Sequence, residues 1–264
     1  DGIFEEVLLL YRETKPFYLI GIDCTIKPPK IGGLSYIGPL VFTEIDDFTM
    51  MANCKLTGAS SPMGPAVYIA GGNMLFMANE IIGNAATLMG GGVCCASMDS
   101  AATPMLIGNR ISRNTAPKGG GIAFNKDNGT LAAMNIVTDN TAQEAGGGIF
   151  LDAARSYILG NYVFQNQTSN HPSHGGGIYL HVPKTAILTG NFIINNTTTG
   201  NGAGIYVRGD GPALPNFSAI GLNYIAGNTS PLNGGGIAME NEANVVFLGN
   251  IVLNNTALNG AGLW

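Results

Sequence analysis

The sequence predicts an all-β solenoid, in which each coil consists of three short strands that pair in parallel with those of the next coil. The first observation is a repeat, since one asparagine ends an apolar run in every unit at steps of 26 to 32 residues. Self-similarity at such a period is typical of stacked repeat architectures. The second is that the apolar runs are too short and too often interrupted for helical spacing. The repeating asparagines are Asn53, Asn79, Asn109, Asn135, Asn161, Asn191, Asn223 and Asn250.

The best-preserved unit indicates how one coil is built. It contains three strand-sized pieces, GGGIYL, TAILTGN and FIINNT, which Gly, Asn and Thr residues separate. In the first piece Ile178 and Leu180 alternate with Tyr179, so the two aliphatic side chains are expected to point inward. When such coils stack in parallel, the inward residues form columns, and each coil adds ~4.8 Å of height.

A second asparagine, five residues after the first, is predicted to form an internal ladder. Amides at equivalent places in stacked coils can hydrogen-bond to the copies above and below, as they do in cross-β structures. Only the first unit departs, because Gly58 stands at this place. The predicted ladder consists of Asn84, Asn114, Asn140, Asn166, Asn196, Asn228 and Asn255.

These GGGI and N-x-I-x-x-N-T-A repeats resemble those of right-handed parallel β-helix proteins, the pectate-lyase-like superfamily, over roughly residues 20–264. The resemblance implies a right-handed β-helix. It does not select a function, because that superfamily includes polysaccharide lyases, glycoside hydrolases, adhesins and structural envelope proteins. In composition and character the chain is also similar to prokaryotic sheath and surface-layer proteins, archaeal ones included.

The N-terminal part is expected to differ from the rest. Residues 1–16 are interpreted as a cap or lead-in, and residues 17–264 as the β-helix, with about nine coils. Within DGIFEEVLLLYRE the apolar residues follow helical spacing, while the glutamates come early and the arginine late, as a helix dipole favours. This pattern favours a short capping helix, although VLLLY also suits a strand.

The composition narrows the class of protein. Charged residues make up 11% of the chain, against the usual ~25%, so an uncovered surface would be prone to self-association; thin β-helices also need much aliphatic and Gly content for their own core. A net charge of -5 provides no basic surface for nucleic acid. No apolar run is long enough for a transmembrane helix. The start at Asp1 indicates a removed targeting segment or a fragment, and the fold suits an extracellular or cell-surface protein.

The cysteines predict one disulfide and no metal site. Cys24 and Cys54 occupy the same slot in adjacent coils, ~5 Å apart, within the Cα range that a disulfide accepts. Such a bond would suit an oxidising compartment. Cys94 and Cys95 lie several coils away from the three histidines, so neither a metal nor a cofactor is expected.

A column of polar residues is the candidate catalytic site. It stands on the outward face, three residues after each GGGI aliphatic, beside an outward aromatic column of Phe150, Tyr179 and Tyr206. The polar column consists of Asn125, Asp152, His181, Arg208 and Glu240.

Two interpretations of this column remain. A polysaccharide lyase would use Arg208 to neutralise a uronate carboxylate and His181 or Tyr206 to abstract the adjacent proton. The preferred interpretation is a ladder of compatible charges on a solvated face, with aromatic rings that stack on each other. A glycosidase is disfavoured, since Asp152 and Glu240 are three coils apart, ~14 Å, whereas paired carboxylates need ~5–9.5 Å.

Glycosylation sequons divide into turn positions and ladder positions. Those at Asn166, Asn196 and Asn228 belong to the ladder and should face inward. The candidate acceptors are therefore in turns, at Asn128, Asn195, Asn216 and Asn254.

The end of the sequence suggests assembly. The last five residues open another coil, so either the chain is truncated there or Leu263 and Trp264 form an uncovered strand edge that pairs with another copy. We therefore expect a non-catalytic extracellular structural subunit that assembles edge-to-edge, in an amyloid-like manner, into a sheath, surface layer or filament. Its partners would be copies of itself and cell-surface glycans. The alternative is a polysaccharide lyase or a carbohydrate-binding adhesin.

Overall fold

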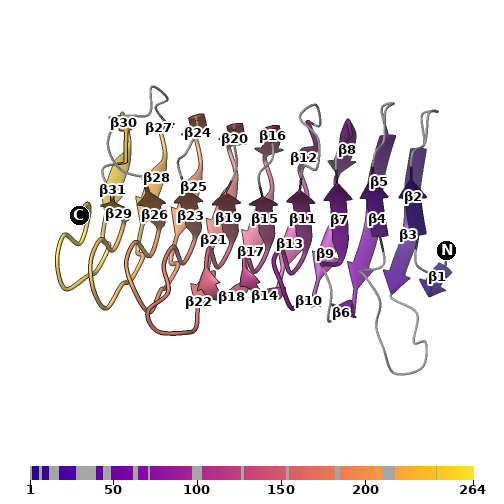
Figure 1. The fold of residues 1–264 in the computed structure, drawn as a ribbon, viewed down its shortest axis with the longest axis horizontal. Coiled ribbons are helices and arrows are strands. Elements are labelled where there is room, and N and C mark those ends of the chain that lie inside the picture. The colour runs from indigo at the N-terminus through magenta and orange to yellow at the C-terminus, as the bar shows by residue number, and fades with distance from the viewer. Residues whose placement is uncertain are drawn as a thin grey trace.

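The computed structural model describes residues 2–5, 8–11, 18–27, 40–43, 49–61, 65–70, 72–96, 103–125, 128–152, 155–181, 185–209, 218–241 and 243–264. Figure 1 shows them as a rod of stacked coils, with the two termini at opposite ends. The predicted all-β solenoid is thereby confirmed.

Three sheets run along the rod, and successive coils add strands to each of them. The nine-stranded sheet contains β2 (Leu8–Tyr11), β4 (Leu40–Thr43), β7 (Val67–Ala70), β11 (Val93–Ala96), β15 (Ile122–Asn125), β19 (Ile149–Asp152), β23 (Ile178–His181), β26 (Ile205–Arg208) and β29 (Ile237–Glu240). The five-stranded sheet contains β6 (Ser60–Ser61), β10 (Ala85–Ala86), β14 (Thr115–Lys118), β18 (Thr141–Ala145) and β22 (Gln167–Thr168).

The large sheet receives two strands from most coils. It contains β1 (Gly2–Glu5), β3 (Tyr18–Lys27), β5 (Thr49–Thr57), β8 (Met74–Met77), β9 (Glu80–Ile82), β12 (Met105–Ile107), β13 (Arg110–Ser112), β16 (Asn128–Ala133), β17 (Ile136–Thr138), β20 (Arg155–Leu159), β21 (Tyr162–Phe164), β24 (Thr185–Thr189), β25 (Phe192–Ile194), β27 (Ser218–Gly221), β28 (Tyr224–Ala226), β30 (Val245–Leu248) and β31 (Ile251–Leu253).

The number of coils is slightly lower than predicted. The described residues make about seven turns rather than nine. The difference arises before residue 65, where the repeat is poorly preserved and only parts of the coils are among the described residues.

The capping helix predicted for the N-terminus is wrong. Residues 2–5 and 8–11 form β1 and β2, which pair in parallel with β3 and β4. Each thus continues a sheet of the solenoid, whose strand edge offers backbone hydrogen-bond partners, whereas an isolated helix of this length is only marginally stable in water. The described part of the chain contains no helix long and apolar enough to cross a membrane.

Columns of aliphatic residues fill the interior, as the alternation in GGGIYL predicts. Ile149, Ile178 and Ile205 pair directly across β19, β23 and β26, and none of the three is exposed to solvent. Leu151, Leu180 and Val207 form a second column two residues further on, which is equally buried. Because each coil buries these residues against the coils beside it, the core is continuous along the rod.

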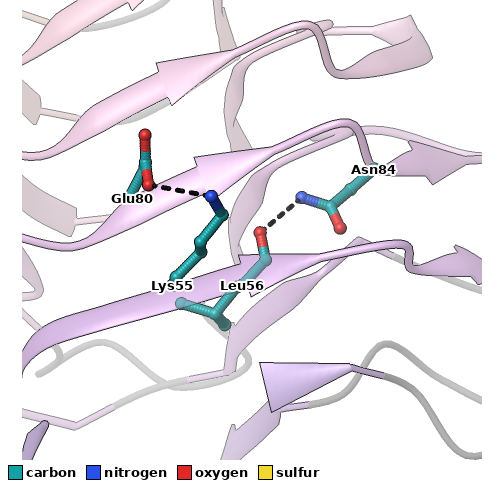
Figure 2. Close-up of polar contacts among 4 residues, drawn as sticks. All are labelled: Lys55, Leu56, Glu80 and Asn84. Carbon is teal, nitrogen blue, oxygen red and sulfur yellow. Dashed lines mark hydrogen bonds and ion pairs between the residues drawn. The ribbon is translucent and has the colours of Figure 1, made fainter. Parts of the chain in front are cut away.

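Two asparagine ladders, not one, run through the interior. In the predicted ladder Asn140 Nδ2 donates to Asn166 Oδ1 at 3.0 Å, and Asn166 Nδ2 donates to Asn196 Oδ1 at 3.1 Å. The repeat asparagines form the second ladder in the same way, for example from Asn135 Nδ2 to Asn161 Oδ1 at 3.0 Å. Each ladder amide also donates to a backbone carbonyl of the preceding coil, as Asn84 does to Leu56 O at 3.3 Å in Figure 2. The amides are thereby satisfied on all sides, as buried polar groups require.

At the first described coils the ladders lie one residue later than the sequence suggested. Cys54, not Asn53, donates its backbone N–H to Asn79 Oδ1, and Ala59, not Gly58, donates its N–H to Asn84 Oδ1, both at 3.0 Å. Asn53 instead adopts a positive φ of 56°. The ladder position follows a left-handed corner residue, and Asn53 and Gly58 occupy that corner.

Every ladder asparagine from residue 79 onward follows a residue with positive φ. Several of these corners are glycines, such as Gly160 at 61° and Gly190 at 66°. At the other corners a residue with a side chain adopts this strained conformation, since the left-handed region brings its Cβ close to the following carbonyl. The corner residues other than glycine are Ala78, Arg113, Met134, Asp139, Gln165, Asn195, Leu222 and Asn254.

We expect Met134→Gly to stabilise the protein. Met134 has a φ of 55° and a largely exposed side chain, so glycine relieves strain and loses little packing. The relief of about 1–2 kcal/mol exceeds the greater unfolded-state entropy of glycine, about 0.4–1 kcal/mol. Denaturant titration should show a gain near 0.5–1 kcal/mol, and Gly160→Ala at the same corner should show a loss. An unchanged or lower stability of Met134→Gly would refute this reading of the corner.

Candidate functional site

The predicted polar column stands on the nine-stranded sheet, at the ends of its strands. Asn125 pairs with Asp152, Asp152 with His181, His181 with Arg208, and Arg208 with Glu240, each on the adjacent strand. The five residues therefore form one continuous row across β15, β19, β23, β26 and β29. We call it the polar row.

The middle of the polar row contains a histidine–carboxylate pair. His181 Nδ1 lies 2.8 Å from Asp152 Oδ1, and both side chains are partly exposed. The carboxylate can only accept, so the ring nitrogen that faces it carries the hydrogen. This bond orients the imidazole, which is how a carboxylate positions a general base in many active sites.

The aromatic column beside the polar row is buried rather than exposed. Phe150, Tyr179 and Tyr206 stack at centroid distances of 5.2 and 5.1 Å, and their exposed fractions are 5%, 8% and 2%. The groove lined by exposed aromatic rings that a lyase would need is thus not formed by these residues. The reason is that residues preceding the glycine clusters pack on the rings: Ala145 belongs to the same apolar cluster, and the ring of His174 stacks on Tyr206 at 4.5 Å.

The hydroxyl of Tyr206 donates a hydrogen bond to the side chain of Glu240. The distance to Glu240 Oε2 is 2.6 Å, while Asn201 Nδ2 donates to the other carboxylate oxygen at 2.6 Å. Burial raises the pKa of Tyr206 far above its ordinary value, and the bond and the negative charge of Glu240 raise it further. Burial also raises the pKa of Tyr179, although a hydrogen bond from Arg208 opposes the rise. Tyr206 therefore stays protonated at neutral pH and is a poor proton acceptor.

The disulfide between Cys24 and Cys54 stays a prediction. The register of β3 and β5 places their Cα atoms directly opposite one another. Cys54 is buried, and its Sγ lies 3.4 Å from Ala52 O. The side chain of Cys24 lies outside the described residues. No group of three or more His, Cys, Asp or Glu side chains suited to a metal ion occurs within the part of the chain that the structure describes.

The sequons and the expected assembly edge are located as follows. Asn166, Asn196 and Asn228 are fully buried in the ladder, while Asn195 and Asn254 are exposed at corners. The side chains of Asn128 and Asn216 lie outside the described residues. Leu263 and Trp264 are 51% and 46% exposed.

The most distinctive surface feature, which the sequence analysis missed, is an apolar patch on the outside of the large sheet. Its side chains are 36% to 68% exposed and come from four successive coils. Strands β17, β21, β25 and β28 of this region contain no charged residue. We call this surface the apolar patch: Met134, Ile136, Tyr157, Tyr162, Phe192 and Leu222.

A stack of aromatic rings runs through the apolar patch along the rod. Tyr162 and Phe192 stack at 4.7 Å with planes 6° apart, and Tyr224 continues the stack at 6.0 Å from Phe192. Tyr162 and Phe192 therefore cover one face of each other, whereas Tyr224 is tilted by 40° against Phe192. Toward the N-terminus the same column becomes charged, with Arg110 and the ion pair between Lys55 and Glu80, 3.4 Å apart, in Figure 2. The sequence did contain a signal for the apolar patch, because outward-facing apolar residues recur at the repeat period.

Comparison with known proteins identifies one relationship. A family model described as the right-handed β-helix region matches residues 41–217. Comparisons with curated proteins and with solved structures find no significant match.

Proposed function

Because the chain belongs to the right-handed β-helix family, we propose that it is a non-catalytic structural subunit that assembles with copies of itself in an extracellular sheath, surface layer or filament. The fold alone does not select this role, since one fold hosts many functions. The observation that carries the proposal is the apolar patch.

The size of the apolar patch supports a contact surface. Aromatic side chains present ~150–250 Å² each, so the exposed fractions of its six residues amount to an area on the order of 500 Å². This area falls within the ~300–600 Å² of the largest apolar patch on a typical soluble monomer, and such patches are often functional. Two such surfaces would together bury about 1,000 Å², the lower bound for a specific protein interface.

The chemistry of the apolar patch favours another copy of the chain over a glycan. An aromatic side chain that binds a sugar usually offers its flat face to the ring of the sugar. Tyr162 stacks flat on Phe192, so one face of Phe192 is already occupied, while the ring of Tyr224 lies 6.0 Å from it at a tilt of 40°. The six residues of the apolar patch carry no charge, so burying them against their own copy leaves none of them as an unpaired ion. The exposed Arg155, two residues before Tyr157 on β20, lies at the border of this surface.

The lyase interpretation has less support. Its proposed base Tyr206 donates its proton to Glu240, and its pKa is raised. His181 and Asp152 remain as an oriented pair beside Arg208, which keeps that alternative testable. Uronate-cleaving activity that His181→Ala and Arg208→Ala both abolish would favour it over the structural role.

The proposed role predicts that charge in the apolar patch prevents assembly. Wild-type protein at micromolar concentration should form polymers visible by electron microscopy. Tyr162→Lys with Phe192→Lys should weaken self-association at least ~100-fold in sedimentation experiments, since each change removes about 1.5 kcal/mol or more of apolar burial. Gln143→Lys with Gln167→Lys adds the same two charges at exposed positions on the five-stranded sheet and serves as the control.

The possible outcomes test the proposed assembly and the apolar patch as its contact surface separately. Wild-type protein that stays monodisperse at high concentration would refute the structural role. Assembly that the patch variants leave unchanged would instead show that the apolar patch is not the contact.

A further inference from the structure

Between two neighbouring coils, a side chain accepts a backbone hydrogen bond that the strand register would assign to a backbone carbonyl. The backbone N–H of Asn201 donates to Nδ1 of His174 at 3.0 Å. One coil earlier, the equivalent N–H of His174 donates to the backbone carbonyl of Glu144 at 3.2 Å. By the same register Asn201 should bond to the carbonyl of Ser173. That oxygen instead accepts the hydroxyl of Thr198 at 2.6 Å, and the imidazole takes its place.

Asn201 connects this substitute bond to the next coil. Its side-chain Oδ1 accepts the backbone N–H of Asn233 at 3.1 Å, and its Nδ2 donates to Glu240 at 2.6 Å. Asn201 is almost completely buried, so its N–H has no ready alternative partner in solvent. Three consecutive coils are therefore joined through one residue, whose backbone N–H is held by one imidazole nitrogen while its carbonyl accepts the N–H of Gly175 at 3.1 Å.

We infer that His174 is an acid-sensitive latch, which holds the backbone N–H of Asn201 only while its imidazole is neutral. In the neutral ring Nδ1 accepts and Nε2 carries the hydrogen, because the partner of Nδ1 is an N–H donor. Protonation gives the ring a second N–H, at Nδ1, and its hydrogen points directly at the N–H of Asn201. Two donors then oppose each other, and a buried N–H loses its acceptor. This inference is independent of the proposed structural role.

The charges around His174 do not remove this sensitivity. Burial lowers the pKa of His174 below its ordinary value; the carboxylate of Glu240 raises it in part, and the guanidinium of Arg208 lowers it further. Tyr206 stacks on the ring as a neutral phenol. On the preceding coils Glu144, which touches His174 through its carbonyl, faces Lys118 at 3.8 Å.

The lowered pKa of His174 determines how the stability of the protein changes with pH. Since the folded-state pKa lies below the unfolded value of about 6.5, the unfolded chain takes up the proton first. The contribution of His174 to stability is thus complete above about pH 6.5 and is lost as the pH falls toward the folded-state pKa.

His171 provides a matched control within the same turn. Its Nδ1 lies 2.8 Å from the carbonyl oxygen of Thr199. A carbonyl can only accept, so this nitrogen is already a donor and remains one after protonation. Acid should therefore leave the His171 contact intact and break the His174 contact.

Hydrogen exchange at the Asn201 amide tests the latch. Between about pH 7.5 and about pH 5, the opening constant, corrected for intrinsic exchange, should rise roughly tenfold or more in the wild type. His174→Gln offers an amide oxygen that does not titrate in this range, so its opening constant should stay flat. His171→Gln should behave as the wild type.

Three results would overturn the inference: a flat opening constant in the wild type, the same rise in His174→Gln, or loss of the rise in His171→Gln instead. If His174→Gln does not fold, the nitrogen chemical shifts of His174 in the wild type decide. Nδ1 must be unprotonated at neutral pH and must become protonated together with exposure of the Asn201 amide.

Discussion

Replacing Asn161 by alanine is expected to lower the free energy of unfolding by more than about 4 kcal/mol. Asn161 Oδ1 accepts both the backbone N–H and the Nδ2–H of Asn135, at 2.9 and 3.0 Å. Its Nδ2 donates to Ala132 O at 2.9 Å and to Asn191 Oδ1 at 3.0 Å. Alanine removes all four bonds at a completely buried site, and each polar group left without a partner costs about 1–3 kcal/mol.

Denaturant titration measures this loss, and exchange at the Asn135 amide locates it. Asn170→Ala is the control, since Asn170 is exposed in a turn. Asn161→Asp is a second probe, because the carboxylate can still accept both bonds from Asn135 but cannot donate to Ala132 or Asn191. A cost for Asn161→Ala within 1 kcal/mol of the Asn170→Ala value would mean that the ladder contributes no more than a surface amide.

Gly148→Ala should be strongly damaging for a single added methyl group, with a loss of about 3 kcal/mol or more, or failure to fold. A Cβ at this position would lie 2.8 Å from the carbonyl oxygen of Gly177 and 3.0 Å from the Asn166 side-chain amide. One neighbour is backbone and the other is a ladder residue bonded on all sides, so neither can move aside. Close-packed interiors transmit such an overlap instead of absorbing it.

Gly262 is the matched control for this prediction. It occupies the same third position of a glycine cluster, but a Cβ there would meet its nearest atom, Val252 Cγ1, only at 3.6 Å. Gly262→Ala should therefore change the thermal midpoint by less than about 2 °C, whereas Gly148→Ala should lower it by about 6 °C or more. Equal effects would show that the close approach of the coils does not explain the glycine cluster.

The fold could be predicted from the sequence because every coil repeats the same local environment. The alternation around Ile178 defines an inward face, and its recurrence once per repeat makes that face a column. The ladder through Asn140 and Asn166 follows from the same period. The ladder position was assigned one residue too early at Asn53. The repeat shows that an asparagine is present there, but it does not show whether that residue or the next one turns the chain. The backbone geometry at Cys54 and Asn79 decided it.

The candidate sites depended on contacts between segments that no local pattern encodes. The strands at residues 2–11 have helical spacing, yet the open edges of β3 and β4 determine their conformation. Tyr206 follows the alternation of an outward residue, yet His174 from another coil covers it. The role of His174 itself depends on Thr198 occupying the carbonyl of Ser173.

The sequence by itself determined the parallel coil, its aliphatic columns and the positions that carry amides, because these follow from one period and one alternation. Only the tertiary structure decided which outward side chains are covered, where the chain turns, and which nitrogen of His174 faces a donor. The physical reason is that inward residues meet their own repeats, whereas outward residues meet whatever the turns bring against them.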